Sequence, residues 1–491
     1  MHQPFIFLGL GALAASLSLL YSIPIAVFCL GLMALWAIVF IVSKKNGLNK
    51  GVVIALIFVI LAVRLISLEA ITENKNQQLI HKTVDFKARI ISVDYNSGKF
   101  AVFSLKVLDC TEKTANNIKL KATMMAQTDA LPGDIISAKA VFTLPSEKYR
   151  ARDYSNGYYY FADISKVYYH ESREASFWRV IYNLRESIAS AISSTGKDEL
   201  SAVLSALIIG DKSGISPEFS LAVQNSGVSH MLVVSGMHLG ILCGVLMNLM
   251  KRRIKLVPSI IIGISVVLFL LAVCLFHVSI LRASIAYIVM LLSRLFKRSP
   301  DSLSALGFGV VVAVLLAPHI FHNVAFQLSI SATFAVLYPS RLLINMADFK
   351  RFGRPGKLLR YVYDILAISV CCMFCTMPIA VSCFGYVALA APITNLLVSL
   401  AISAALIIGV FAVIIFFLPL GKYISLPLFF LARAFTRFFT VVVEFIGEKG
   451  FGVVLVEKDK SIYCFVIAIA FILLVKLLSV YIIKRKEKKL C

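Results

Sequence analysis

The chain has 491 residues, of which 59% are hydrophobic and only 15% are charged, and its mean hydropathy is +0.87. Soluble domains carry roughly 25% charged residues, so this composition excludes an ordinary soluble enzyme and indicates a polytopic α-helical membrane protein. The formal net charge of +23 is compatible with a nucleic-acid partner. However, much of the excess lies in short basic loops, as the positive-inside rule predicts for any multi-pass protein.

Three apolar segments open the chain, at residues 5–21, 24–42 and 51–71. Each is close to the ~20 residues that cross a bilayer. The first has no basic start and no obvious cleavage site, which indicates a retained helix and not a signal peptide. Three lysines between the second and third segments place that loop in the cytoplasm. We therefore predict an N-terminal three-helix membrane segment over residues 1–74, after which the chain emerges outside.

Residues 75–172 form a large polar region in which apolar and polar residues alternate in several short stretches. These stretches are residues 84–90, 100–107, 118–124 and 135–142. Pro132, Gly133 and Asp134 supply a turn before the last one. Several short strands in about 100 residues predict a small OB-like β-barrel, which the topology places on the extracytoplasmic side.

Residues 173–227 read as amphipathic or interfacial helices. The first, at 176–194, places apolar residues on one face. Two shorter helical stretches follow at 198–209 and 217–224. We expect all three to lie at or in the outer membrane surface.

Residues 228–483 contain the main bundle, and with the N-terminal segment they predict about 11–12 transmembrane helices. The candidate spans are residues 229–249, 257–276, 279–296, 302–320, 323–344, 362–383, 402–420, 424–446 and 462–483. The segment at 387–400 is apolar but short, and Pro378 and Pro392 flank it. This pattern predicts a broken or re-entrant helix. Alternating the spans from an external barrel puts every basic loop inside, including the basic tail at 484–491, so the C-terminus is expected in the cytoplasm.

The most informative stretch is residues 225–240, which combines two histidines, three serines and three glycines in an apolar segment. Polar groups at membrane depth usually face a protein interior or a water-filled path. Ser235 and His238 are three residues apart and can touch on a helix, while His230 falls near its outer end. The functional interpretation is a channel lining, and the alternative is an interhelical hydrogen bond. A Ser-His hydrolase is a further alternative, although the Gly-x-Ser-x-Gly elbow is absent. No metal site is expected, because two histidines lack further ligands.

Other polar residues interrupt later spans. Arg282 lies a few residues inside one span, where it can contact phosphate through its bidentate fork. Gln327 and Ser329 lie on another span and can face a channel or pack against a neighbouring helix. Arg433 and Arg437 are four residues apart, and we expect them to reach for the membrane interface.

An aromatic cluster lies next to basic residues near the end of the polar region. Its members are Arg150, Arg152, Tyr154, Tyr158 and Tyr160. Aromatic side chains beside cations suit single-stranded nucleic acid, because bases stack while cations follow the phosphates. The alternative is that the aromatic residues fill a barrel core.

Four ordered motifs resemble the ComEC family of competence proteins. The sequence at 206–211, which ends in Gly210-Asp211, is similar to a Leu-Leu-x-Gly-Asp element. The most specific motif is 226–240, which resembles a signature ending in Ser-Gly-x-His-x-Gly and contains Ser235, Gly236, His238 and Gly240. Residues 325–333 resemble a Phe-Gln-Leu-Ser element. The fourth motif runs from Pro378 to Asn395. Residues 152–154 are similar to the piece that ends the family's N-terminal polar domain.

This resemblance implies a channel in the cytoplasmic membrane that imports single-stranded DNA during natural transformation, with the polar domain as the family's OB-fold. The channel candidates implied are Gly210, Asp211, His230, Ser235, Gly236, His238, Gly240, Arg282, Gln327, Ser329 and Asn395. The expected partners are DNA, membrane lipids, an outer DNA receptor and a cytoplasmic ATPase or helicase, because no Walker motif occurs. A homo-oligomer is a further possibility.

One feature departs from many family members, which carry a metallo-β-lactamase-like domain with a His-x-His-x-Asp-His cluster. No His-x-His pair occurs in this chain, so we expect a transport channel without nuclease activity and without a cofactor, with any nuclease supplied separately. Two alternatives remain open. One is a membrane enzyme acting on lipid or peptide through Ser235 and His238. The other is a degenerate family member with an envelope role.

Overall fold

The computed structural model describes residues 79–487, with gaps at 97–99, 113–114, 126–128, 147–149, 151–152, 155, 172–175, 252, 277, 296–301, 317–319, 321, 348, 350–352 and 449–451. The three helices predicted within residues 1–74 therefore lie outside the described residues, as do Arg152 and residues 488–491 of the basic tail. The chain divides into two compact units. One holds the sequence up to Glu186 together with Gly307–Asn323, and the other holds Ser187–Leu306 and Val324 onward.

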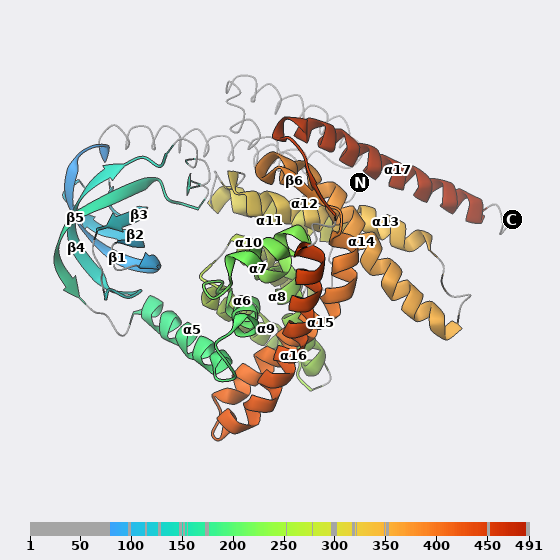
Figure 1. Cartoon of the computed structure of the whole chain (residues 1–491), viewed down its shortest axis with the longest axis horizontal. Helices are drawn as coiled ribbons and strands as arrows, with labels where there is room; N and C mark the ends of the chain where they lie inside the picture. Colours follow the sequence, from blue (N-terminus) through green and yellow to red (C-terminus); the bar gives the residue numbers. More distant parts are fainter. Residues whose placement is uncertain are drawn as a thin grey trace. The chain divides into compact units, whose positions relative to one another are not determined.

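The first unit contains a closed five-stranded barrel in the order β1-β2-β3-β5-β4 (Figure 1). Its strands are β1 (Thr83–Asn96), β2 (Ala101–Cys110), β3 (Lys119–Met124), β4 (Ile135–Thr143) and β5 (Tyr160–Glu171). Only the β3–β5 pair is parallel. The predicted alternation turns one face of each strand inward, so Phe103, Phe142 and Tyr160 fill the centre with at most 2% of their surface exposed.

A buried ion pair joins the barrel to the start of helix α5 (Phe177–Ser193). Asp134 follows the turn at Gly133, whose φ of 99° favours glycine. Its carboxylate accepts hydrogen bonds from the Arg179 guanidinium, from the backbone N–H of Leu131 at 3.0 Å, and from His170 Nε2 at 2.8 Å. The Asp134 and Arg179 side chains are 1% and 9% exposed. This barrel-to-helix ion pair fixes the direction in which the chain leaves the barrel.

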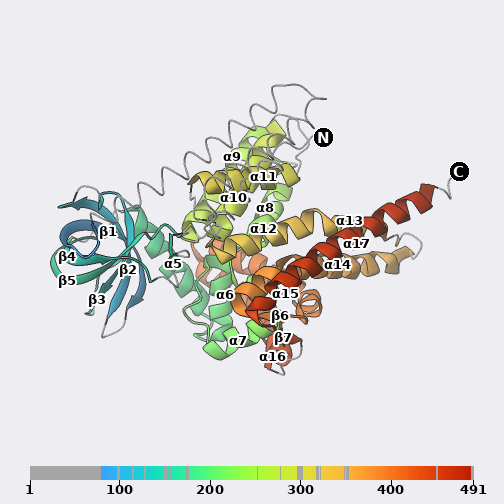
Figure 2. The ribbon, with the colours of Figure 1, turned by 90° about the horizontal axis from the view of Figure 1, so that it is seen from above.

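The rest of the described chain is almost entirely helical. In chain order the elements are α6 (Glu199–Ile209), α7 (Pro217–Asn225), η2 (Ser229–Leu232), α8 (Gly236–Met250), α9 (Leu256–Val273), α10 (Val278–Leu295), α11 (Ser302–Leu316), α12 (Val324–Leu337), α13 (Pro339–Met346), α14 (Gly353–Phe384), β6 (Tyr386–Ala388), α15 (Ala391–Phe416), α16 (Gly421–Glu448), β7 (Val453–Leu455), η5 (Lys458–Lys460) and α17 (Ser461–Glu487). In the second unit, α14 and α17 run side by side (Figure 2), where the rings of Phe374 and Phe471 stack at 4.2 Å.

Five helical segments in the described part are long and apolar enough to cross a membrane. They are Leu256–Val273, Pro355–Phe384, Ala391–Phe416, Gly421–Glu448 and Lys458–Ile482. A multi-pass membrane protein with a small β-barrel is therefore what this architecture supports. The predicted total of 11–12 spans stays a prediction.

Three of the predicted segments take a different form. Residues 387–400 are not a separate broken helix. Residues 387–388 belong to strand β6, and from Ala391 the segment runs on into the next predicted span as the single 26-residue helix α15. Pro392 lies in its first turn, where no backbone N–H bond is lost, so it starts this helix and does not break it. The predicted span 323–344 is divided at Pro339 into α12 and α13. The predicted span 229–249 becomes helical α8 only at Gly236.

Two tight helix contacts and one short ribbon organise the C-terminal hairpin of α15 and α16. An added Cβ on Gly409 would lie 2.9 Å from Ile208 of α6, and one on Gly447 would lie 2.3 Å from the carbonyl oxygen of Ala222 in α7. Strand β6 precedes the hairpin and pairs antiparallel with β7, which follows it. The two ends of the hairpin are therefore tied together by backbone hydrogen bonds.

Candidate functional site

The polar segment at 225–240 folds as two short pieces around a bend. Gly227 has a φ of 78°, and an added Cβ would lie only 2.6 Å from that of Ala391, so glycine is required for both reasons. The helical turn η2 follows and carries His230, whose side chain is exposed. The chain then extends before α8 begins at Gly236.

Ser235 is the N-cap of α8. Its backbone is extended, with φ −131° and ψ 176°, and its Oγ accepts the backbone N–H of Met237 at 3.3 Å. The backbone N–H of Ser235 donates to His238 Nδ1 at 3.3 Å, which completes a capping box with histidine at the third helical position. The serine Oγ also lies 3.1 Å from His238 Nδ1. The predicted contact between Ser235 and His238 is therefore present in the structure.

His238 is 1% exposed and has a defined tautomer. Because the Ser235 N–H can only donate, Nδ1 must accept, and the ring proton of neutral His238 lies on Nε2. Nε2 is buried and forms no hydrogen bond within the described part of the chain. The backbone of Met231 and the ring of His230 are its electrostatic neighbours.

Arg282 on α10 approaches the same helix start. An added Cβ on Gly236 would lie 4.0 Å from Arg282 Nη2 and 3.3 Å from the Cβ of Ala283. Arg282 is 8% exposed, and its Nε donates to Ser329 Oγ on α12 at 3.0 Å. Its Nη2 donates to the same oxygen. Residues from three separately predicted segments therefore lie close together in one cluster, which we call the α8 entrance. Its members are Ser235, Gly236 and His238 of α8, Arg282 of α10 and Ser329 of α12.

The remaining channel candidates lie in other settings. Gly210 is the left-handed C-cap of α6 with φ 74°, and an added Cβ would lie 3.4 Å from Val234, near the start of α8. Asp211 accepts the Ser213 N–H at 3.0 Å in a local turn. Gln327 is half-buried on α12. Gly240 has open space around it.

Asn395 belongs to a separate polar contact between α14 and α15. Its Nδ2 donates to Ser369 Oγ at 2.6 Å. Its Oδ1 is buried without a hydrogen-bond donor among the described residues. The structure therefore does not bring Asn395 into the bonded cluster at α8.

Arg433 pairs with an acidic side chain of a distant helix start. It forms a two-pronged ion pair with Asp198, with Nη1 to Oδ1 at 2.8 Å and Nη2 to Oδ2 at 2.5 Å. Its Nη1 also donates to Ser201 Oγ at 2.7 Å. Arg437, one turn later, is exposed. The carboxylate partner, Asp198, lies more than 200 residues away in sequence, and the placement of Arg433 and Arg437 at the membrane interface stays a prediction.

The barrel aromatics divide between its core and its surface. Tyr160 is 2% exposed and packs against Phe142, so the barrel-core alternative applies to it, and no base can stack on it. Tyr158 is half-buried, with its Oη 2.9 Å from Ser104 Oγ and Lys121 Nζ 5.3 Å from its ring centre. Burial raises the pKa of the Tyr158 phenol, so it stays neutral. The rings of Tyr154 and Tyr159 pack with their centres 5.0 Å apart and their planes tilted by 36°.

A different tyrosine, Tyr168, is more exposed than the aromatic residues predicted from the sequence. Tyr168 occupies a bulge in β5, since Ser137 pairs with Tyr169 while Ala138 pairs with Val167. Its side chain is 52% exposed, with Lys166 Nζ 5.5 Å from the ring centre.

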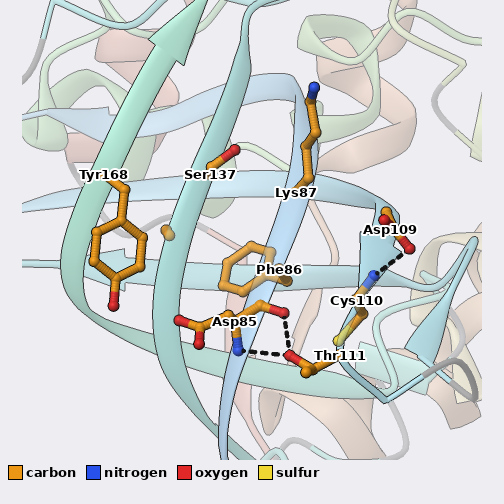
Figure 3. Close-up of a pocket in the computed structure, with 9 residues that line it drawn as sticks. Asp85, Phe86, Lys87, Asp109, Cys110, Thr111, Ser137 and Tyr168 are labelled. Carbon is orange, nitrogen blue, oxygen red and sulfur yellow. Dashed lines mark hydrogen bonds between the residues drawn. The ribbon is translucent and has the colours of Figure 1, made fainter.

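Tyr168 lines an open pocket of about 200 Å³ on the barrel (Figure 3). The pocket is also lined by Asp85, Phe86, Lys87, Asp109, Cys110, Thr111, Ser137 and Ala138. The sequence analysis missed this surface, although an adjacent pair of tyrosines beside a lysine was a readable signal.

Arg150 keeps a local contact, because its Nε donates to the carbonyl of Pro145 at 3.3 Å.

The α8 entrance does not form a hydrolytic triad. A serine nucleophile needs a histidine base that a third group orients, yet His238 Nε2 has no such partner in the described ranges. The Ser235 Oγ is engaged as a helix cap. No three His, Cys, Asp or Glu side chains among the described residues lie close enough to hold a metal ion. The arrangement instead offers hydrogen-bond donors and one cation.

These features define a multi-pass membrane protein with a polar cluster inside its helical unit. The model of the family described as "Competence protein" matches residues 207–480, more than half of the chain, and the protein belongs to this family. That match includes the α8 entrance, four of the five membrane-compatible segments in full, and the fifth up to residue 480.

Two curated relatives resemble shorter parts of the chain. "ComE operon protein 3" of Bacillus subtilis (strain 168) is 28% identical over 175 residues, which are 35% of this chain and 22% of that protein. An "Uncharacterized protein" of Aquifex aeolicus (strain VF5) is 31% identical over 180 residues, 36% of this chain and 41% of that protein. The matched segments thus span less than half of each relative. No solved structure matches the chain.

Proposed function

We propose that this protein is a channel that conducts single-stranded DNA across the cytoplasmic membrane during natural transformation. Membership of the competence protein family supports the process. The name of the Bacillus subtilis relative, which refers to a competence operon, is consistent with it. The helical unit conducts the strand, and the barrel receives it outside.

The observation that carries the proposal is the α8 entrance. Polar groups are expensive at membrane depth and mark substrate paths, and here they converge from three helices. Ser235 and His238 come from α8, Arg282 from α10 and Ser329 from α12. Gly236 lets the guanidinium of Arg282 approach the backbone of α8. The proposed path runs past this cluster, with His230, Gly240, Gln327, Gly210, Asp211 and Asn395 as further lining candidates.

We place the barrel outside the membrane as an OB-like domain. Its closed order β1-β2-β3-β5-β4, with a single parallel pair, supports this assignment. OB-folds are five-stranded Greek-key barrels that bind oligonucleotides. The proposed contact surface includes Arg150, Arg152, Tyr154 and Tyr158, to which we add Tyr168.

Tyr168 can be tested against its neighbour. Base stacking on an aromatic side chain contributes roughly 1–3 kcal/mol, so Tyr168→Ala should weaken oligonucleotide binding to the purified protein by about 5- to 150-fold. Tyr169→Ala is the matched control, because Tyr169 is equally exposed, at 54%, but does not line the pocket. Equal losses in both variants would contradict a role for the pocket.

The energy that drives DNA import comes, in this proposal, from partner proteins. Conduction requires binding that is favourable but not trapping, and a few dispersed polar groups meet this requirement. A DNA receptor outside, an ATPase or helicase inside and a separate nuclease are the partners we propose, and a second copy of the chain is a further candidate.

The test is DNA uptake in a transformable relative that lacks its own family member. The unaltered chain should restore uptake. His238→Ala, expressed and inserted equally, should not restore it, because the alanine removes one partner of the capping box and the buried Nε2 donor. If the unaltered chain and His238→Ala both restore uptake, the channel function is supported and the role of His238 is limited to helix packing. Turnover of a labelled lipid or peptide without DNA uptake would instead favour the membrane-enzyme alternative.

A further inference from the structure

We propose that the α8 entrance is a phosphate-binding site, at which Arg282 and the first turn of α8 hold one phosphodiester of the DNA strand at a time. This inference rests on the proposed function and assigns its chemistry to particular atoms. The ligand class is a singly charged phosphodiester anion, recognised by charge and by N–H donors and not by base identity.

The first argument is the uncompensated charge of Arg282. Its side chain is 8% exposed, and within the described part of the chain it forms no ion pair. Its only hydrogen-bond partner there is the neutral hydroxyl of Ser329. A buried cation is costly unless an anion accompanies it. By contrast, the equally buried Arg179 is paired with a carboxylate. Among the described residues, Arg282 therefore lacks the anion that a buried cation requires.

The second argument is the helix start beside it. The first N–H groups of a helix have no intrahelical acceptor, and the helix dipole makes this end positive. In α8 the Ser235 Oγ already accepts the N–H of Met237, so this end offers an anion the Gly236 N–H and the positive end of the dipole. Gly236 brings the guanidinium to within 4.0 Å of the position that a Cβ would occupy. A cation placed against a helix N-terminus is electrostatically unfavourable by itself. An anion between the two would be stabilised by both.

The third argument is the buried ring of His238 in the same turn. His238 Nε2 is buried without a hydrogen bond among the described residues, in a side chain that is 1% exposed. Its other nitrogen is held by the backbone of Ser235, which fixes the ring. The fixed ring holds the Ser235 cap, and with it the first turn of α8, in place beside Arg282.

Ser329 gives the site a way to release its ligand. In the absence of phosphate, its hydroxyl occupies the two guanidinium donors Nε and Nη2. A phosphate must displace this hydroxyl, and the hydroxyl must return before the next phosphate arrives. Such competition lowers the affinity, which suits conduction better than a permanently open cationic fork.

The experiment measures binding of the purified full-length chain in lipid nanodiscs to two oligonucleotides of the same sequence. One has the natural phosphodiester backbone, and the other has neutral methylphosphonate linkages. We expect Arg282→Met to weaken binding of the natural strand by about 10- to 100-fold. The slope of log affinity against log salt should fall by about 0.7, the loss of one contact to a single strand. Ser329→Ala should bind the natural strand more tightly than the unaltered chain, because the competing hydroxyl is gone.

Two controls separate the site from folding and from general charge. Arg294→Met removes an exposed arginine from the same helix and should leave binding within about twofold, because surface charges are screened by salt. Arg282→Met removes an unpaired buried charge and should not lower the thermal unfolding temperature. Arg282→Lys keeps the charge but loses the fork, and should bind with intermediate affinity.

Clear outcomes overturn the inference. The phosphate-binding proposal is wrong if Arg282→Met leaves the affinity and the salt slope unchanged, or if the phosphodiester and methylphosphonate strands bind equally well. The proposed channel function would still stand in that case if the unaltered chain restores DNA uptake. Conversely, loss of phosphodiester binding in Arg282→Met together with failure of the unaltered chain to restore uptake would retain the site and reject the channel.

Discussion

Replacing Asp134 by alanine should release the barrel from helix α5. Asp134 is 1% exposed, and its removal would leave the Arg179 guanidinium, 9% exposed, buried without its carboxylate. Breaking a buried ion pair from one side costs about 3–5 kcal/mol. The half-exposed His170 adds less than about 1 kcal/mol, because its 40% exposed side chain is well solvated. The expected loss therefore corresponds to roughly a 100- to 4,000-fold increase in local opening.

Hydrogen exchange of the full-length protein measures this opening directly. The amides of β4 and of the first turn of α5 should lose protection by the factor above in Asp134→Ala. Asp109→Ala is the matched control, because the Asp109 carboxylate is exposed and accepts only the neighbouring N–H of Cys110 at 3.0 Å. Asp109→Ala should change the free energy of local opening by less than about 1 kcal/mol.

A double variant tests the physical reason. In Asp134→Ala combined with Arg179→Met, the unpaired charge is gone, so most of the lost protection should return. The reasoning is refuted if Asp134→Ala resembles the Asp109 control. It is also refuted if the double variant is less protected than Asp134→Ala alone.

Three further changes give expected outcomes elsewhere in the chain. Phe103→Ala truncates a barrel-core side chain that is 1% exposed and should lower the free energy of unfolding of the barrel by about 3–5 kcal/mol. Hydrogen exchange of the barrel strands at increasing denaturant concentration measures this loss. Gly447→Val should lower the thermal unfolding temperature, because its Cβ would lie 2.3 Å from the carbonyl oxygen of Ala222, and Gly447→Ala should do so less. Burial opposes ionisation of Asp198, but the hydrogen bonds of Arg433 outweigh it and lower its pKa below the ordinary 3.8. This pairing therefore stabilises the fold above about pH 4 and is lost as the pH falls through the lowered value, so the difference in unfolding temperature from Asp198→Asn should vanish in that range.

The sequence was sufficient for features that depend on local patterns. Four barrel strands follow from period-two alternation, and the ends of α6 and α7 follow from readable caps at Asp198, Gly210 and Ser216. The fifth strand was not predicted, because its inward alternation ends at Ile164 and the residues beyond are exposed. The aromatic and basic residues near the start of β5 suggested a nucleic-acid surface, and their pattern did not indicate a strand.

Features that depend on how distant segments pack could not be predicted. The residues Arg282 and Ser329 were both singled out, but their hydrogen bond joins helices 47 residues apart. The partner of Arg433 lies 235 residues away. In an apolar bundle many helix registers bury the same side chains, so the hydrophobic pattern does not select one. Only the assembled packing shows which polar groups meet.

The β6–β7 ribbon has a mechanical consequence for the C-terminal hairpin. Val387 pairs with Val454 just before α15 begins and just after α16 ends. Because this pairing joins the outer ends of the two helices, we expect the two helices to move together. Helix α6 is seated on α15 at Gly409, and α7 is seated on α16 at Gly447. We therefore expect a tilt of the hairpin to move α6 and α7 with it, together with the bend at Gly227 that leads to α8.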